Sequence, residues 1–262
     1  MKSRFTTTIN QLTIVVMLCC IASPTLAERS NFLDLQLATE DYAPMNYFER
    51  GVFKGISIDL LNLIWQREGI TNEPEIVLYP WARAYFELKN EPNFVLFAVA
   101  RIPSRETLFE WACPIVDTHY ILLAKKSSKI KINSIDDLEN YTIGTVRSDV
   151  SEQALLSILN EPFNILSNTS MRPNLELMDK GRVHMIAYDK LGANQMLSNA
   201  GRNPEDFESV YTVADSQTCF AFNKQVDPDI ITRFRQHLQA IVEDGQYQEI
   251  LSRYYGPKQL LN

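Results

Sequence analysis

The chain has 262 residues, of which 45% are hydrophobic and 22% charged, the composition of a packed globular protein. Its 32 acidic residues outnumber its 25 basic residues, for a net charge of −7. This acidic balance argues against nucleic acid as a partner, because nucleic acid selects basic patches.

Residues 1–27 have the pattern of a cleavable secretory signal. Basic residues precede a short apolar core, and small residues end the segment at Ala27. The apolar core is shorter than the ~20 residues that a membrane span needs. Cys19 suggests a lipoprotein anchor as an alternative, but Leu18 stands before it, where such an anchor requires a small residue. We therefore expect cleavage after Ala27 and export.

Two cysteines follow the predicted signal, Cys113 and Cys219. An exported compartment permits a disulfide between them, and two buried free thiols are the alternative. A single pair without a Cys-x-x-Cys motif is a poor signal for a metal or redox site.

The first half of the chain alternates between strand and helix patterns, which indicates an α/β fold. Polar and aromatic loops follow two of the strands, and they supply Tyr42, Tyr47, Trp81 and Arg83 as candidate ligand contacts. Each of the aromatic residues could instead cover the core. The predicted strands are 34–38, 76–79 and 94–98, and the predicted helices are 56–67 and 81–89.

Arg105 lies in the polar turn that follows the strongly apolar strand 94–98. Open α/β sheets bind ligands beyond the carboxyl ends of their strands. A guanidinium offers a rigid fork of donors that matches a carboxylate, so Arg105 is a candidate anion clamp. The alternative is a solvated loop arginine.

The second half repeats the alternation. Arg147 and Ser148 follow a predicted strand and lead into a helix, whose free amides form an anion site. Asp149 adds a carboxylate there, which would repel a ligand carboxylate unless Arg147 neutralises it. Asp189 directly follows another apolar strand. The predicted strands are 120–124, 141–146, 183–188, 209–213 and 219–223, and the predicted helices begin near 150, 171 and 227.

Several of these segments together resemble the family 3 solute-binding proteins. The segments are ARIPSRETLFEW, GISIDLL, MDKGRVHMIAYDK and GQYQEILSRYYG, and their order and spacing span nearly the whole mature chain. The resemblance implies the two-lobe periplasmic binding protein fold of type II, an α/β fold in which the second lobe is inserted into the first and two hinge strands join them. It places lobe 1 at 28–118 and 215–262, and lobe 2 at 119–214.

The resemblance also implies roles for single residues. Arg105 matches the family arginine that holds a ligand α-carboxylate, and Asp189 matches the aspartate that accepts hydrogen bonds from the α-ammonium. Ala100 and Ile102 stand where the family prefers hydroxyl residues. Ligand contacts are therefore expected from Arg105, Asp189, Tyr42, Tyr47, Trp81, Arg83, Arg147 and Ser148.

The function implied is capture of a small polar solute, an amino acid or related zwitterion, in the cleft between the lobes. The expected protein is a periplasmic monomer with an ABC permease as its partner and without a cofactor, a metal or a catalytic residue. A periplasmic sensor that passes its closed form to a membrane receptor is the alternative, and a lyase or dehydratase on the same fold is a further one. The three histidines show no HExxH or other metal-binding spacing.

Overall fold

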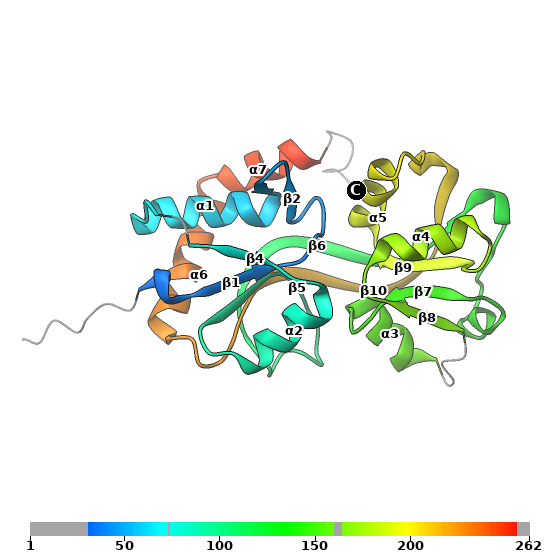
Figure 1. Cartoon of the computed structure of the whole chain (residues 1–262), viewed down its shortest axis with the longest axis horizontal. Helices are drawn as coiled ribbons and strands as arrows, with labels where there is room; N and C mark the ends of the chain where they lie inside the picture. Colours follow the sequence, from blue (N-terminus) through cyan, green and yellow to red (C-terminus); the bar gives the residue numbers. More distant parts are fainter. Residues whose placement is uncertain (1–30, 73, 160–163, 256–262) are drawn as a thin grey trace, which may run out of the picture.

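The computed structural model describes residues 31–72, 74–159 and 164–255, and an eight-stranded mixed sheet of order β4-β1-β5-β10-β6-β9-β7-β8 runs through them. Figure 1 shows two lobes side by side. Helices α1, α2, α6 and α7 surround one end of the sheet, and α3, α4 and α5 surround the other. Strands β6 and β10 pass through both lobes.

Lobe 1 is built on three parallel strands, in which β1 pairs with both β4 and β5. Strand β5 is buried along nearly its whole length, as its unbroken apolar sequence predicts. A small antiparallel hairpin, β2–β3, precedes the first helix. The bounds are β1 Gln36–Thr39, β2 Tyr47–Glu49, β3 Val52–Lys54, α1 Ile56–Glu68, β4 Ile76–Leu78, α2 Trp81–Asn90, β5 Phe94–Arg101, α6 Pro228–Glu243 and α7 Gln246–Tyr254.

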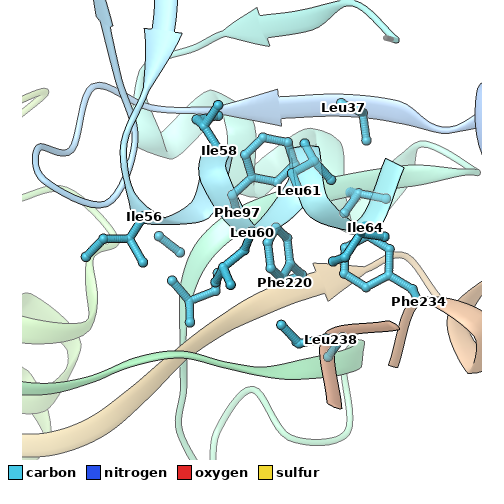
Figure 2. Close-up of a cluster of buried hydrophobic side chains, with 14 of the residues drawn as sticks. Leu37, Ile56, Ile58, Leu60, Leu61, Ile64, Phe97, Phe220, Phe234 and Leu238 are labelled. Carbon is cyan, nitrogen blue, oxygen red and sulfur yellow. The ribbon is translucent and has the colours of Figure 1, made fainter. Parts of the chain in front are cut away.

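The core of lobe 1 joins residues from both ends of the chain (Figure 2). Helix α1 contributes Leu60, Leu61 and Ile64, whose spacing places them on one buried face. Phe234 of α6 stacks edge-on against Phe220 at 4.9 Å between ring centroids. Truncating such a buried ring to alanine costs about 3–5 kcal/mol, so this contact fixes helix α6 on the lobe.

Two long antiparallel strands, β6 (Glu110–Lys125) and β10 (Phe207–Phe222), connect the lobes. A disulfide between Cys113 and Cys219 crosslinks them within lobe 1. Their ladder runs from the pair Phe222 and Glu110 to the pair Phe207 and Lys125. It passes through the pair Asp215 and His119 at the predicted lobe boundaries. The division at 118/119 and 214/215 therefore falls inside the connecting strands, and it stays a prediction.

Lobe 2 repeats the parallel β-α arrangement, with β7 between β8 and β9. Strand β9 also pairs antiparallel with β6, which attaches the lobe to the connecting strands. The bounds are β7 Ile143–Val146, α3 Val150–Ile158, β8 Ile165–Asn168, α4 Met171–Asp179, β9 Met185–Asp189 and α5 Lys190–Asn199.

Most predicted elements match the observed ones within two or three residues. The predicted strands 209–213 and 219–223 instead form the single strand β10, because the polar residues between them pair with β6 on the partly exposed connection. The predicted strand 120–124 is likewise the end of a longer strand that begins at Glu110. The predicted signal, residues 1–27, lies outside the described residues.

Candidate functional site between the two lobes

A cavity of about 660 Å³ lies between the lobes. Lobe 1 contributes Trp81 from the start of α2 and the loop after β1. Lobe 2 contributes residues from the turn after β7 and from helices α4 and α5. The wall is aromatic and acidic at its centre, with Glu40, Asp41, Tyr42, Trp81, Tyr120, Asp149 and Tyr188. A volume of this size suits a small-molecule ligand.

Asp189 ends strand β9 and begins helix α5. Its Oδ1 accepts hydrogen bonds from the amides of Leu191 at 3.0 Å and Gly192 at 2.9 Å, which caps the helix. Its Oδ2 is buried and has no hydrogen-bond partner in the described protein. Burial raises the pKa of Asp189 to about 6. One oxygen thus caps the helix. The other lies next to Tyr42 and Gly192, which line the cavity, whereas Asp189 itself is not part of the wall.

Tyr42 brings a second unpartnered polar group to the cavity wall. The side chain is 5% exposed, and its hydroxyl forms no hydrogen bond of ordinary geometry with the described residues, although it lies close enough to the Asp189 carboxylate to lower the pKa of that group. Its ring lies 5.7 Å from that of Tyr188, so the two tyrosines of opposite lobes form one aromatic wall. Burial, followed by the charge of Asp189, raises the pKa of the Tyr42 phenol, which therefore stays neutral.

Three further carboxyl groups lie along the cavity, those of Glu40, Asp41 and Asp149. Burial raises the pKa of each of them. The charges of Asp149 and Asp189 raise the pKa of Glu40 further, whereas Arg105 lowers it. Because the groups influence one another, the cavity concentrates negative charge, which Arg105 offsets in part.

Arg105 is buried beside the cavity, with 1% of its surface exposed, but it is not part of the wall. Its guanidinium lies 5.2 Å from the ring centroid of Trp81 and 4.9 Å from that of Tyr85. It donates to the carbonyl oxygens of Ala100 at 3.4 Å and Ser148 at 3.2 Å, while its Nε has no hydrogen-bond partner among the described residues. The aromatic rings and carbonyl groups hold the cation without an acidic partner.

Ser148 forms the turn between β7 and α3 in a left-handed conformation, with φ of 61°. Its carbonyl oxygen accepts from the Trp81 indole at 2.9 Å as well as from Arg105. Its amide donates to the Glu152 carboxylate at 2.6 Å. Glu152 also accepts from the Thr145 hydroxyl at 2.9 Å. The turn is thus held by a side chain of its own helix.

The structure brings some of the predicted ligand residues to the cavity and leaves others away from it. Tyr42 and Trp81 line the wall. Tyr47 lies on the half-buried hairpin strand β2, and Arg147 is exposed. Arg83 pairs with Glu87 at 3.5 Å and lies 4.0 Å from the Tyr79 ring. A ligand role for these last three stays a prediction.

Sequence reasoning did not find several wall residues. Glu40 belongs to the predicted polar loop after β1, so its carboxylate could have been proposed as a ligand contact from the sequence. Tyr120 lies in a connecting strand, and Tyr188 lies in the apolar strand β9, one residue before its end. In the sequence, both tyrosines have the pattern of ordinary core residues. Only the packing of the two lobes places their rings on the wall of the same cavity.

No metal centre is evident in the part of the chain that the structure describes. This part contains no group of three or more His, Cys, Asp or Glu side chains that is placed to hold a metal ion.

Within residues 31–72, 74–159 and 164–255, no helix has both the length and the apolar character to cross a bilayer.

The chain belongs to the bacterial extracellular solute-binding proteins, family 3, which it matches over residues 35–257. The family is described as one of solute-binding proteins. The fold and the interlobe cavity agree with that class: a solute-binding protein of the type II periplasmic binding protein fold.

Two relatives support the same assignment. A probable histidine-binding protein of Campylobacter jejuni is 24% identical over 236 residues, covering 87% of each chain. A probable amino-acid ABC transporter-binding protein of Haemophilus influenzae is 25% identical over 221 residues, covering 82% of this chain and 81% of the relative. Among solved structures, a histidine kinase sensor domain with similarity to periplasmic binding proteins has a TM-score of 0.75 at 17% identity, covering 85% of this chain and 96% of that one.

Proposed function

We propose that this protein captures a small amine-bearing solute, an amino acid or related amine, in the cavity between its lobes and delivers it to an ABC importer from the periplasm. One observation carries the proposal. Neither the fully buried Oδ2 atom of Asp189 nor the Tyr42 hydroxyl beside it forms a hydrogen bond of ordinary geometry with a described residue, and Tyr42 lines the cavity. A buried acceptor without a donor is costly, and a ligand ammonium removes that cost.

Ligand capture follows from the placement of these groups on different lobes. Glu40, Tyr42 and Trp81 belong to lobe 1, whereas Asp149 and Asp189 belong to lobe 2. A solute that contacts both sets stabilises only the closed arrangement, so binding shifts the population toward it. An importer can use this shift, because the closed form is the one that holds solute.

The names of the relatives support an amino-acid solute and an ABC transporter as the partner. The Haemophilus relative is an amino-acid ABC transporter-binding protein, and the Campylobacter relative is a probable histidine-binding protein. Together with the predicted signal at residues 1–27, they support a periplasmic binding subunit with a permease as its partner. We assign no catalytic step to the cavity, and we expect ligand to leave it chemically unchanged.

The test is a thermal-shift screen of the purified protein against amino acids and aliphatic amines, followed by calorimetry on each hit. A ligand that binds only the folded state raises the melting temperature as its concentration increases. Replacing Asp189 by asparagine should weaken binding of the hit more than about tenfold, since a buried charge pair is lost. The exposed Asp136→Asn change, at the start of the short 3-10 helix Ile135–Asn140, is the charge-matched control.

Two results would refute this proposal. One is equal affinity in the wild type and Asp189→Asn, which would remove the site. The other is chemical conversion of the bound solute, which mass spectrometry of the released ligand would detect and which would replace a binding function with a catalytic one.

A further inference from the structure

We propose that the cavity has an arm between helices α4 and α5 that receives the side chain of a bound amino acid and selects long, unbranched aliphatic chains. The α4–α5 arm is defined by Met171 and Leu175 of α4 and by Gly192, Met196 and Ala200 along α5, which all line the cavity. The inference rests on the proposed function and names the solute class of the same cavity. Its basis is the length, the lining and the charge balance of the arm.

The arm follows α5 over nearly the whole length of the helix. Its lining residues Gly192, Met196, Asn199 and Ala200 recur at the three- and four-residue spacing of one helix face. Because a helix rises about 1.5 Å per residue, the arm extends about 12 Å from Gly192 to Ala200. Helix α4 lies next to α5 in lobe 2 and supplies the opposite side (Figure 1). An extended chain of about three residues has this length, so the arm holds more than the head group of one amino acid.

The charged head of an amino acid belongs at the inner end of the arm. A Cβ at Gly192 would touch both Asp189 Oδ2 and the Tyr42 ring, so these groups meet where the arm begins. Burial raises the pKa of Glu40, the charge of Asp189 raises it further, and Arg105 lowers it, which places these charges at the same end. An amino acid whose ammonium and carboxylate are held here has the arm as the remaining space for its side chain.

The floor of the arm is apolar. Met171 and Leu175 are 7% and 3% exposed, and the partly buried Met196 packs against the same core cluster. Methionine side chains are flexible and polarizable, so they adapt to an unbranched chain that lies against them. Each methylene that leaves water for such a surface strengthens binding about threefold. The floor therefore rewards chain length.

The charged residues at the outer end of the arm balance one another. Arg172 pairs with Glu176 at 3.7 Å, and Arg202 pairs with Asp179 at 2.5 Å. The Arg202 guanidinium also donates to the carbonyl oxygen of Ala200 at 2.8 Å. A cationic or anionic chain end would meet both signs of charge there. The outer end thus gives no preference for a charged side chain, and length and apolar character remain as the basis of selection.

The test is calorimetry on the purified protein with straight-chain amino acids that share one head group: alanine, norvaline, norleucine, 2-aminoheptanoate and 2-aminooctanoate. We expect affinity to increase about threefold for each methylene beyond norvaline. Affinity that is flat or falls beyond norvaline would overturn the inference and leave the proposed function intact, because the short members would still bind. Binding of no member would also overturn it, and the screen against other amino acids and amines would then decide the proposed function.

Two variants show whether the arm causes the dependence on length. Ala200 is exposed, so Ala200→Phe fills the outer end without disturbing the core, and it should reduce the ratio of 2-aminooctanoate affinity to norvaline affinity about tenfold. Ser198→Phe places the same ring on the same helix outside this cavity and should leave the ratio unchanged. Met196→Ala removes part of the floor and is a second, independent variant that should also reduce the ratio. An unchanged ratio in folded Ala200→Phe and Met196→Ala would contradict the inference.

Discussion

The guanidinium of Arg105 in lobe 1 donates a hydrogen bond to the carbonyl oxygen of Ser148 in lobe 2, over 3.2 Å. The same oxygen accepts from the Trp81 indole at 2.9 Å. Both donors belong to lobe 1, and the left-handed backbone of Ser148 presents the acceptor to them. One carbonyl group thus fastens the two lobes at the edge of the cavity.

This fastening predicts a conformational effect of Trp81→Phe. The change keeps an aromatic ring over Arg105 but removes the indole donor, so it destabilises the closed form by one hydrogen bond, about 0.5–1.5 kcal/mol. We expect ligand affinity to fall between about twofold and tenfold. Calorimetry measures the affinity, and small-angle scattering of the free protein should show a more open average shape. Unchanged affinity and shape would mean that this bond does not hold the lobes together.

We expect that position 192 must be glycine for the ammonium site to form. A Cβ at this position would lie 2.4 Å from Asp189 Oδ2 and 2.9 Å from a ring carbon of Tyr42. Gly192→Ala must therefore displace the carboxylate or the ring, and we expect ligand affinity to fall about tenfold or more. Ala193→Gly changes the helix propensity of the same helix without adding a Cβ next to Asp189, so it serves as the control. Normal affinity in Gly192→Ala would show that the free oxygen of Asp189 is not the ligand acceptor.

The pKa of Asp189 predicts a pH dependence of ligand binding. Burial raises this pKa to about 6, and burial raises the pKa of the nearby Glu40 and Asp149 carboxyl groups as well, while Arg105 acts in the opposite direction on both of these. A ligand ammonium requires the ionised carboxylate, so affinity should increase about tenfold between pH 5 and pH 7. Calorimetry at half-unit intervals measures this increase. Asp189→Asn should flatten the profile.

The same shift affects the stability of the ligand-free protein in the opposite sense. Because the folded protein holds the Asp189 proton more tightly than the unfolded chain does, this group's contribution is fully present below about pH 4 and is lost as pH rises toward 6. The ligand-induced increase in melting temperature should therefore be larger at pH 7 than at pH 5. A larger increase at pH 5 would contradict the assignment of Asp189 as the ammonium acceptor.

The disulfide predicts a contribution to stability rather than to recognition. It joins Cys113 and Cys219 over a sequence separation of 106 residues, so the crosslink restricts the unfolded chain strongly. Replacing both cysteines by serine should cost about 2–4 kcal/mol. The melting temperature should fall by about 2–4 °C for each kcal/mol in a protein of this size. Calorimetry of the folded double variant should show unchanged ligand affinity, because neither sulfur atom lines the cavity.

Much of the fold could be predicted from the sequence because the elements carry strong local signals. The apolar run of β5 and the spacing of Leu60, Leu61 and Ile64 on α1 each define one element without reference to the rest. The long strand β10 was divided in the prediction because its middle is polar. That polarity is explained by its position, since this part of the strand connects the lobes and faces solvent.

The site could be predicted only in part. Tyr42 and Trp81 were predicted because each follows a strand, where ligands of α/β proteins bind, and both line the cavity, whereas Asp189, predicted at the end of an apolar strand, lies behind the wall. Their role in ligand binding stays a prediction. The contacts of the Arg105 guanidinium could not be predicted, since its position near the rings of Trp81 and Tyr85 depends on how α2 packs. The bond from Ser148 to Glu152 likewise depends on the conformation of one turn. Such contacts decide which polar groups remain open to a ligand.

A crystal structure of the protein with its highest-affinity ligand tests the central claim most directly. The account predicts the ligand in the interlobe cavity, with a cationic nitrogen within hydrogen-bond distance, about 3 Å, of Asp189 Oδ2 and close to the Tyr42 hydroxyl. A ligand bound elsewhere, or one in the cavity with no cationic nitrogen near Asp189, would contradict it.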